Sequence, residues 1–330
     1  MNKQQESCAG TRYDRSESRL HDLVPPRKLT RSAGRFGGTS NGTGGATIRR
    51  ATIADAEACG HIIYDAFAGI AKAHNFPFDF PSRESACQIA ASFIGIPAIF
   101  GIVAEIDGAV VGSNFLSESD TVRAVGPISV EPAQQGAGIG WQLMAAVLER
   151  AGPGAQVRLV QDAFNTASVS LYASIGFDVK EPLLLLHGTP TAARRRDIIV
   201  RHMTARDIDA CNALCVSAHG FDRSNELHHA VAHLRPMVAQ RGQRITGYMT
   251  APTFWIMNHG VAETDQDMAA LLVGAADASP EPVTLLLPTR QAELFRWCLN
   301  AGMRVVKPMT LMAKGHYQEP TGTWFPSVLY

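Results

Sequence analysis

Three glycines lie close together in the segment Gln135–Gly140 (QGAGIG), between a predicted strand and a predicted helix. Such a turn presents free backbone N–H groups at the positive end of a helix dipole, and that geometry suits an anion. Glycine tolerates positive φ and leaves no Cβ between the backbone and a phosphate. Alone, such a cluster also fits an ordinary tight turn, but its position after a strand and before a helix predicts a cradle for a phosphate-bearing ligand.

The elements that must position this turn follow from the spacing of apolar residues. Residues spaced by three and four predict two helices, and the Asp107-Gly108 pair between two apolar runs is typical of an antiparallel hairpin. The predicted order is a strand at 48–51, a helix around 59–70, an aromatic loop at 75–81, a helix from 82, strands at 99–106, 110–116 and 124–130, the glycine turn with its helix, a strand at 157–161, a helix at 168–174, and strands around Phe177 and 183–186.

A dinucleotide-binding fold is the main alternative interpretation of the glycine turn. Asp162 follows the next strand at a plausible distance for an acid that binds a ribose. However, Trp141 stands where that fold needs its third glycine, and an antiparallel hairpin does not belong in a doubly wound parallel sheet. An NAD(P)-dependent oxidoreductase is therefore kept only as a remote alternative.

The chain repeats itself. Val157–Leu186 aligns without gaps on Val283–Met312, so that Gly176 matches Gly302 and Pro182 matches Pro308. This repeat predicts two copies of one fold. The predicted organisation is a disordered segment at 1–46, a first domain at 47–188, a polar linker at 189–197, a second domain at 198–316 and an aromatic tail at 317–330 that contains Tyr317, Trp324, Phe325 and Tyr330.

Two motifs in the first copy resemble those of the GCN5-related N-acetyltransferase (GNAT) superfamily. Gln135–Gly140 is similar to the family's Arg/Gln-x-x-Gly-x-Gly/Ala signature, and Asn165-x-x-Ser168-x-x-Leu171-Tyr172-x-x-x-Gly176-Phe177 is similar to its second half-motif. The resemblance covers about residues 48–186. It implies an α/β (α+β) fold of two tandem GNAT-like domains, each a mixed, mainly antiparallel sheet flanked by helices.

The resemblance also implies acetyl-CoA as co-substrate and transfer of its acetyl group to an amine, which we expect to belong to a small molecule. The loop amides would bind the pyrophosphate, and the preceding strand and the second motif would bind the pantetheine arm. The residues implied at this site are Ile128, Val130, Gln135, Gly136, Ala137, Gly138, Ile139, Gly140, Asn165 and Ser168. A CoA-binding sensor or scaffold without turnover is the alternative from another functional class.

The transfer requires a neutral amine, not an ammonium ion, and a proton donor assists the departure of the thiolate. Tyr172 stands where the family places that acid, although its ring could equally serve only in packing. Glu118 and Asp162 are the two candidate bases, and either could be a plain surface carboxylate. The aromatic loop offers Phe76, Phe78 and Phe80 as the predicted lining of the acceptor site.

The second copy lacks these features. Matching Met144–Ala146 to Met268–Ala270 places His259–Thr264 over the glycine turn, which leaves one glycine and introduces Glu263. Asn165 then becomes Gln291, and Tyr172 becomes Cys298. The second copy is therefore predicted to keep the fold without a cofactor site, in a role that shapes the acceptor site or a homodimer interface.

Composition disfavours several classes of protein, namely those that bind nucleic acid, span a membrane, are secreted or bind a metal. Lys plus Arg equals Asp plus Glu at 30 each, which disfavours a nucleic-acid partner, and no apolar run is long enough to span a membrane. The N-terminus has no hydrophobic signal segment, so a cytoplasmic protein is expected. The six cysteines form no CxxC pair, and His228, His229 and His233 are interpreted as a solvated helix face, so no metal is expected.

Overall fold

The computed structural model describes residues 45–329, so almost all of the predicted disordered segment at 1–46, together with Cys8 and Tyr330, lies outside the described residues. The first copy begins with β1 (Thr47–Arg50), a short 3-10 turn (Ile53–Asp55) and helix α1 (Ala56–Ala73). The predicted capping residues meet here, because the N–H and hydroxyl of Thr52 donate to the Asp55 carboxylate at 2.8 and 3.0 Å. Arg49 donates two further bonds to that carboxylate and holds its pKa well below the usual range.

The other elements of the first copy follow the predicted order. They are α2 (Arg83–Gly95), β2 (Ile99–Ile106), β3 (Ala109–Ser117), β4 (Arg123–Val125), β5 (Ser129–Val130), a 3-10 turn (Pro132–Gln134), α3 (Ile139–Ala151), β6 (Val157–Asp162), α4 (Thr166–Ser174) and β7 (Asp178–Gly188). The strand predicted over 124–130 is interrupted at Gly126 and Pro127, because proline has no N–H to donate to a ladder. The two strands predicted around Phe177 and 183–186 form one long strand, β7.

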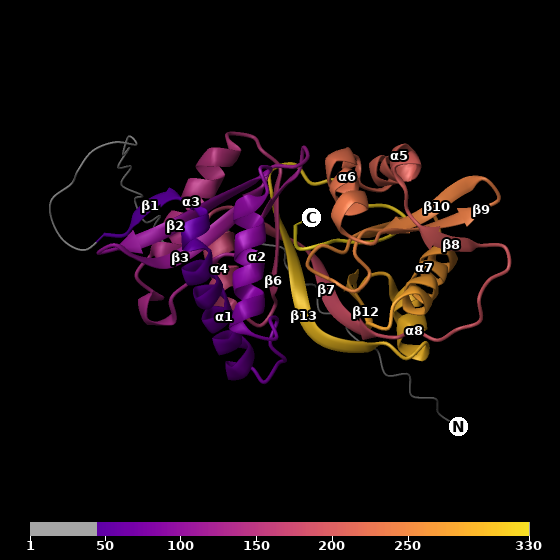
Figure 1. Cartoon of the computed structure of the whole chain (residues 1–330), viewed down its shortest axis with the longest axis horizontal. Helices are drawn as coiled ribbons and strands as arrows, with labels where there is room; N and C mark the ends of the chain where they lie inside the picture. Colours follow the sequence, from indigo (N-terminus) through magenta and orange to yellow (C-terminus); the bar gives the residue numbers. More distant parts are fainter. Residues whose placement is uncertain (1–44, 330) are drawn as a thin grey trace, which may run out of the picture. The chain divides into compact units, whose positions relative to one another are not determined.

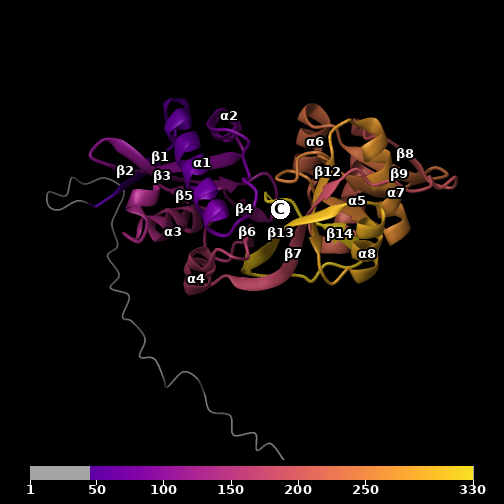
Figure 2. The same ribbon diagram turned by 90° about the horizontal axis from the view of Figure 1, so that it is seen from below.

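The helices cover both faces of the sheet. Figure 2 shows α1 and α2 on one face and α3 and α4 on the other. Neighbouring residues of β3 point to opposite faces: Phe115 meets Phe93 of α2 with ring centroids 5.6 Å apart, while Leu116 belongs to the core beneath α3. This layered core fixes the position of β5 and of the start of α3, between which the glycine turn lies.

The second copy follows the order of helices and strands of the first, except that one strand replaces β4 and β5 and a short strand is added at its end. Its elements are β8 (Ile199–His202), a 3-10 turn (Ala205–Asp207), α5 (Ile208–His219), α6 (Ser224–His233), β9 (Met237–Arg241), β10 (Arg244–Met249), β11 (Gly260–Ala262), α7 (Asp265–Ala278), β12 (Val283–Pro288), α8 (Ala292–Asn300), β13 (Arg304–Lys314) and β14 (Thr323–Phe325). The bounds of β12, α8 and β13 fall on those of β6, α4 and β7 at the gap-free register read from the sequence. The predicted repeat is confirmed.

The two copies exchange their long final strands. One sheet has the order β1-β2-β3-β4-β6-β13-β7-β12, with β5 on β3, and a second has the order β14-β11-β10-β9-β8. Thus β13 of the second copy pairs with β6 of the first, from Lys314 opposite Val157 to Met309 opposite Asp162. In return β7 pairs with β12, and Figure 1 shows β7 and β13 side by side between the copies. The linker at 189–197 separates the repeats along the chain, but the sheet continues from one into the other, and residues 45–329 form one unit.

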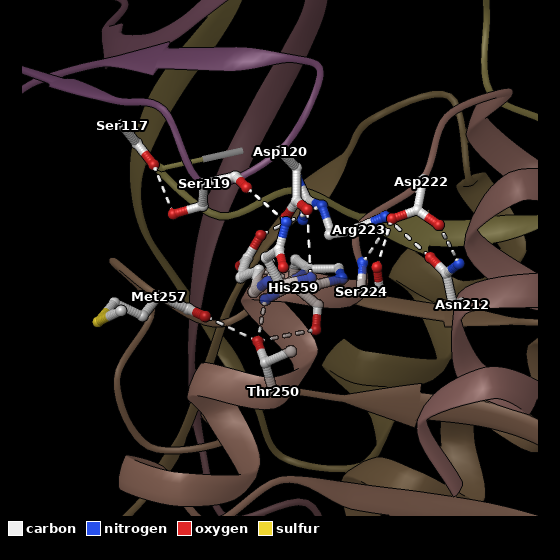
Figure 3. A network of polar contacts seen from close by, with 12 residues as sticks. Ser117, Ser119, Asp120, Asn212, Asp222, Arg223, Ser224, Thr250, Met257 and His259 are labelled. Carbon is white, nitrogen blue, oxygen red and sulfur yellow. Dashed lines mark hydrogen bonds and ion pairs between the residues drawn. The ribbon is translucent and has the colours of Figure 1, made fainter. Parts of the chain in front are cut away.

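A polar network joins the β3–β4 connection to the second copy (Figure 3). The Asp120 carboxylate accepts the N–H groups of Asn225 and Glu226, at 3.2 and 3.1 Å, at the start of α6. Behind them, the Glu226 carboxylate lies 3.2 Å from His259 Nδ1. Burial raises the pKa of Glu226 to about 7 and lowers that of His259 well below its usual value. The network therefore couples the two copies through ionisable groups.

The aromatic tail is docked in its described part. Trp324 and Phe325 are buried, and β14, which contains them, pairs antiparallel with β11. In residues 45–329, none of the helices combines the length and the apolar character that a bilayer-spanning segment requires. The cysteines described in the structure are all free thiols, namely Cys59, Cys87, Cys211, Cys215 and Cys298.

Candidate active site

The central strands of the first copy part from one another beside the glycine turn. The parallel strands β4 and β6 pair at only two positions, Arg123 with Val157 and Ala124 with Arg158. The chain then turns away at Gly126, and β5 pairs with β3 instead of β6. The edge of β6 is left facing a gap, and a cavity of about 730 Å³ occupies it.

The glycine turn closes one end of this cavity. Gly136 and Gly138 have φ angles of +84° and +83°, a conformation that favours glycine, and a Cβ on either would meet no atom within 4 Å. Gly138 is the N-cap of α3, and no side chain caps this helix. The N–H groups of the first helical turn therefore point into open space, as a bound phosphate requires.

The second motif forms the start of α4, opposite the turn. Asn165 is the N-cap of this helix, and its Oδ1 accepts the Ser168 N–H at 3.2 Å. The Gln135 side chain donates to the Val130 carbonyl at 3.1 Å, which ties the turn to the strand before it. These bonds hold the cavity walls in place before any ligand arrives.

Tyr172 lies in the cavity wall on α4, with 5 % of its surface exposed. Burial raises the pKa of its phenol to about 12, so the group keeps its proton at neutral pH. The Tyr172 ring also packs edge-on against Phe177, with centroids 6.3 Å apart, which fixes its direction. A neutral, fixed phenol is suited to donate a hydrogen bond or a proton to a leaving group.

The cavity brings together most of the residues predicted from the sequence. It is lined by Ile128, Val130, Gln135, Gly136, Gly138, Ile139, Gly140, Asp162, Asn165, Ser168, Tyr172 and Phe80. Ala137 is on the turn but is exposed and does not line the cavity. The lining also includes residues of the second copy and the tail that the sequence did not indicate, namely Trp255, Ile256, Met309 and Val328.

Three other predicted residues lie elsewhere. Glu118 forms ion pairs with Arg123 and Arg150 and does not line the cavity, so the geometry does not fit a general base. Phe76 stacks on Phe164 at 4.3 Å between ring centroids, and the half-exposed Phe78 packs on Tyr64. Of the three aromatic residues predicted to line the acceptor site, only Phe80 lines the cavity.

A buried charged cluster lies beside the cavity where β6 ends. Lys307 of β13 is 2 % exposed, and its Nζ lies 2.5 Å from an Asp79 oxygen and 2.6 Å from an Asp162 oxygen. Burial raises the pKa of Asp162, and the Lys307 ammonium opposes that shift. Sequence reasoning missed Lys307, although a lysine in the middle of a largely apolar strand such as β13 is a signal that could have revealed it.

Comparison with known proteins agrees with this geometry. Residues 68–177 match the sequence model described as the acetyltransferase (GNAT) family. The first copy is a GNAT domain. The GNAT family has acyl-CoA-dependent acetyltransferase activity, and acetyl-CoA is its co-substrate. The match ends just before β7, the strand that leaves the first copy in the exchange.

Solved structures extend the comparison to the tandem fold. A candidate acetyltransferase from Pyrococcus horikoshii is 19 % identical with a TM-score of 0.69, covering 90 % of this chain and 99 % of its own. A GCN5-related N-acetyltransferase from Sphaerobacter thermophilus is 16 % identical with a TM-score of 0.58, covering 84 % and 98 %. A tandem GNAT protein from the clavulanic acid pathway is 12 % identical with a TM-score of 0.53, covering 82 % and 98 %. The search of curated proteins returned no match.

The GNAT turn is absent from the second copy, and the sequence alignment there was wrong. Glu263 donates its N–H to the Thr246 carbonyl at 2.9 Å, as Glu131 does to Val111 at 2.8 Å, so Glu263 corresponds to Glu131 and not to a residue of the turn. The gap-free alignment had hidden a deletion. Only Glu263 and Thr264 separate β11 from α7. In the first copy the whole segment Glu131–Gly138 separates β5 from α3.

The chain's own tail occupies the second copy's equivalent of the carrier cleft. β14 pairs with β11, where the first copy has its gap beside β5. Gln291, at the position of Asn165, donates its Nε2 to the Trp324 carbonyl and accepts the Trp324 N–H at 3.2 Å. Cys298, at the position of Tyr172, is fully buried. A GNAT cleft filled by backbone in this way has no room for a carrier.

Proposed function

We propose that the first copy transfers an acetyl group from acetyl-CoA to the amine of a small-molecule acceptor. The observation that carries this proposal is the parting of β5 from β6 beside an uncapped glycine turn, with the Tyr172 phenol in the wall of the same cavity. The turn would hold the pyrophosphate, and the backbone of Ile128 and Val130, together with Asn165, would hold the pantetheine arm in the gap beside β6. The acceptor would enter from the end walled by Phe80, Trp255 and Met309.

The cavity residues supply the proton transfers that the reaction needs. Asp162 takes a proton from the incoming ammonium and passes it to water, leaving a free amine. The nitrogen then forms a bond to the acetyl carbonyl carbon, and the carbon–sulfur bond breaks. Tyr172 gives its proton to the departing sulfur and recovers one from the nitrogen that has become an amide. Acetyl-CoA and amine thus yield amide and CoA thiol, with one proton released from the ammonium.

The experiment that tests the proposal is thiol release from acetyl-CoA with a panel of amines. We expect amine-dependent release from the purified full chain. Acetyl-CoA binding without release for every amine would contradict the proposal and would favour a CoA-binding sensor.

Tyr172→Phe tests the acid role. We expect the turnover number to fall about 100-fold, because the leaving sulfur loses its proton donor, while the Kd for acetyl-CoA stays the same. Tyr64→Phe is the matched control, since Tyr64 packs on Phe78 outside the cavity lining. An unchanged turnover number in the Tyr172 variant would remove the acid role.

A further inference from the structure

The acceptor end of the cavity is built by both copies. The first copy contributes Asp79 and Phe80 from the loop between α1 and α2, and Asp162 from the end of β6. The second copy contributes Trp255 and Met309, with Met309 directly opposite Asp162 in the β6–β13 pairing. The strand exchange therefore brings Lys307, two residues before Met309, against the acceptor site.

The cluster at this end carries an unbalanced charge. One ammonium, Lys307 Nζ, lies between two carboxylates, at 2.5 Å from Asp79 and 2.6 Å from Asp162. All three side chains are almost fully buried, with 2 %, 7 % and 6 % of their surfaces exposed. With both carboxylates ionised, one negative charge remains, and a buried charge without a partner is costly. A cationic ligand group would supply that partner.

A second observation indicates that a polar ligand enters the same cavity. Gln161, the neighbour of Asp162 on β6, is 7 % exposed and lines the cavity, yet its side-chain oxygen and nitrogen have no hydrogen-bond partner among the described residues. Buried amide groups are almost always hydrogen-bonded in a complete structure. A ligand in the cavity would provide the missing partners.

The other walls are apolar. Ile70, Phe80, Trp255, Met309 and Val328 line the same cavity. The Lys307 ammonium lies 5.5 Å from the Trp255 ring centroid, so this indole already faces the charged cluster and can also face a ligand cation. Apolar walls beside a single excess negative charge select a ligand with a positive end and an apolar body.

We propose that the Asp79–Lys307–Asp162 cluster, assembled across the exchanged strands, selects acceptors that are primary alkylamines bound as ammonium ions, with an apolar body and no carboxylate. This inference rests on the proposed function and specifies its acceptor class. Lys307 acts as a positioning residue: it holds the two carboxylates together and sets their joint charge, while the carboxylates contact the ammonium.

The test compares three acceptors with acetyl-CoA and the full chain: 2-phenylethylamine, which is an ammonium ion at neutral pH; aniline, which is neutral; and phenylalanine, which carries a carboxylate. Wild-type protein is expected to have its highest kcat/KM with 2-phenylethylamine. Asp79→Asn removes the excess charge and keeps the Lys307–Asp162 pair. We expect kcat/KM for 2-phenylethylamine to fall roughly 10- to 100-fold, the usual effect of losing a hydrogen bond to a charged group, with a smaller change for aniline.

A charge-restoring variant separates this role from a structural one. Asp79→Asn combined with Lys307→Met leaves Asp162 as a lone carboxylate, which restores one negative charge, and the preference for 2-phenylethylamine over aniline should return. Asp178→Asn, at an exposed carboxylate, controls for the change in net charge. Equal losses for both amines in Asp79→Asn, no rescue in the double variant, or a wild-type preference for phenylalanine would overturn the inference. Thiol release from no amine at all would instead refute the proposed function.

Discussion

Gly138→Asp is the sharpest perturbation of the glycine turn. Gly138 is the N-cap of α3 at φ +83°, with open space in front of it. An aspartate carboxylate there would compete for the same helix N–H groups that the pyrophosphate needs and would repel its charge. Two like charges about 5 Å apart repel each other by roughly 1 kcal/mol in water and roughly 3 kcal/mol in a partly buried site. The Kd for acetyl-CoA should therefore rise roughly 5- to 150-fold.

The protein itself should tolerate this change. A non-glycine residue at positive φ costs about 1 kcal/mol, and aspartate at an N-cap recovers part of that cost. Gly154→Asp is the matched control, because Gly154 has a similar φ of +78°, also faces open space and lies outside the cavity lining. Gly138→Ala isolates the backbone effect from the charge.

The assay is calorimetric titration of acetyl-CoA into each variant, with urea unfolding to confirm the fold. We expect the order of Kd to be Gly138→Asp weakest, Gly138→Ala intermediate, and Gly154→Asp equal to wild type. If Gly138→Asp binds acetyl-CoA as tightly as wild type, or if Gly154→Asp weakens binding equally, the turn does not hold the pyrophosphate.

Two further predictions concern stability. Glu226 has a pKa raised to about 7 in the folded state, so its contribution to stability is present at pH below about 4.5 and is lost as the pH rises through about 7. Between pH 5 and pH 8, the free energy of unfolding, measured in urea, should fall by up to about 3 kcal/mol more for wild type than for Glu226→Gln. The same change with pH in both proteins would contradict this. Trp324→Ala should lower the free energy of unfolding by about 3 to 5 kcal/mol, because the indole is buried in the second copy's cleft. Phe78→Ala, at a half-exposed ring, should cost far less, and equal losses in the two variants would count against a docked tail.

The local features of the site could be predicted from the sequence because each is encoded by neighbouring residues. Glycines at 136 and 138 are required by positive φ, and Asn165 is three residues before the N–H that it caps. The gap-free repeat likewise gave the bounds of β12, α8 and β13, since equal spacing of apolar residues produces equal elements.

Features that depend on long-range pairing could not be predicted in this way. β7 and β13 carry the same apolar pattern, so hydrophobicity cannot tell whether each pairs within its own copy or in the other. Lys307 lies beside Asp162 only because of that exchange. The deletion before α7 was missed, because a gap-free match extended upstream from the helix passes over residues that the second copy lacks.

The exchanged strands also bear on how this gene can change. If the coding sequence were cut at the linker, each fragment would carry a long strand that belongs in the other fragment's half and would lack the neighbour for its own central strand. Unpaired strand edges of this kind associate with whatever complements them. The two fragments would have to be made together to fold, so selection acts on both repeats as one heritable unit, even though only one of them retains the turn.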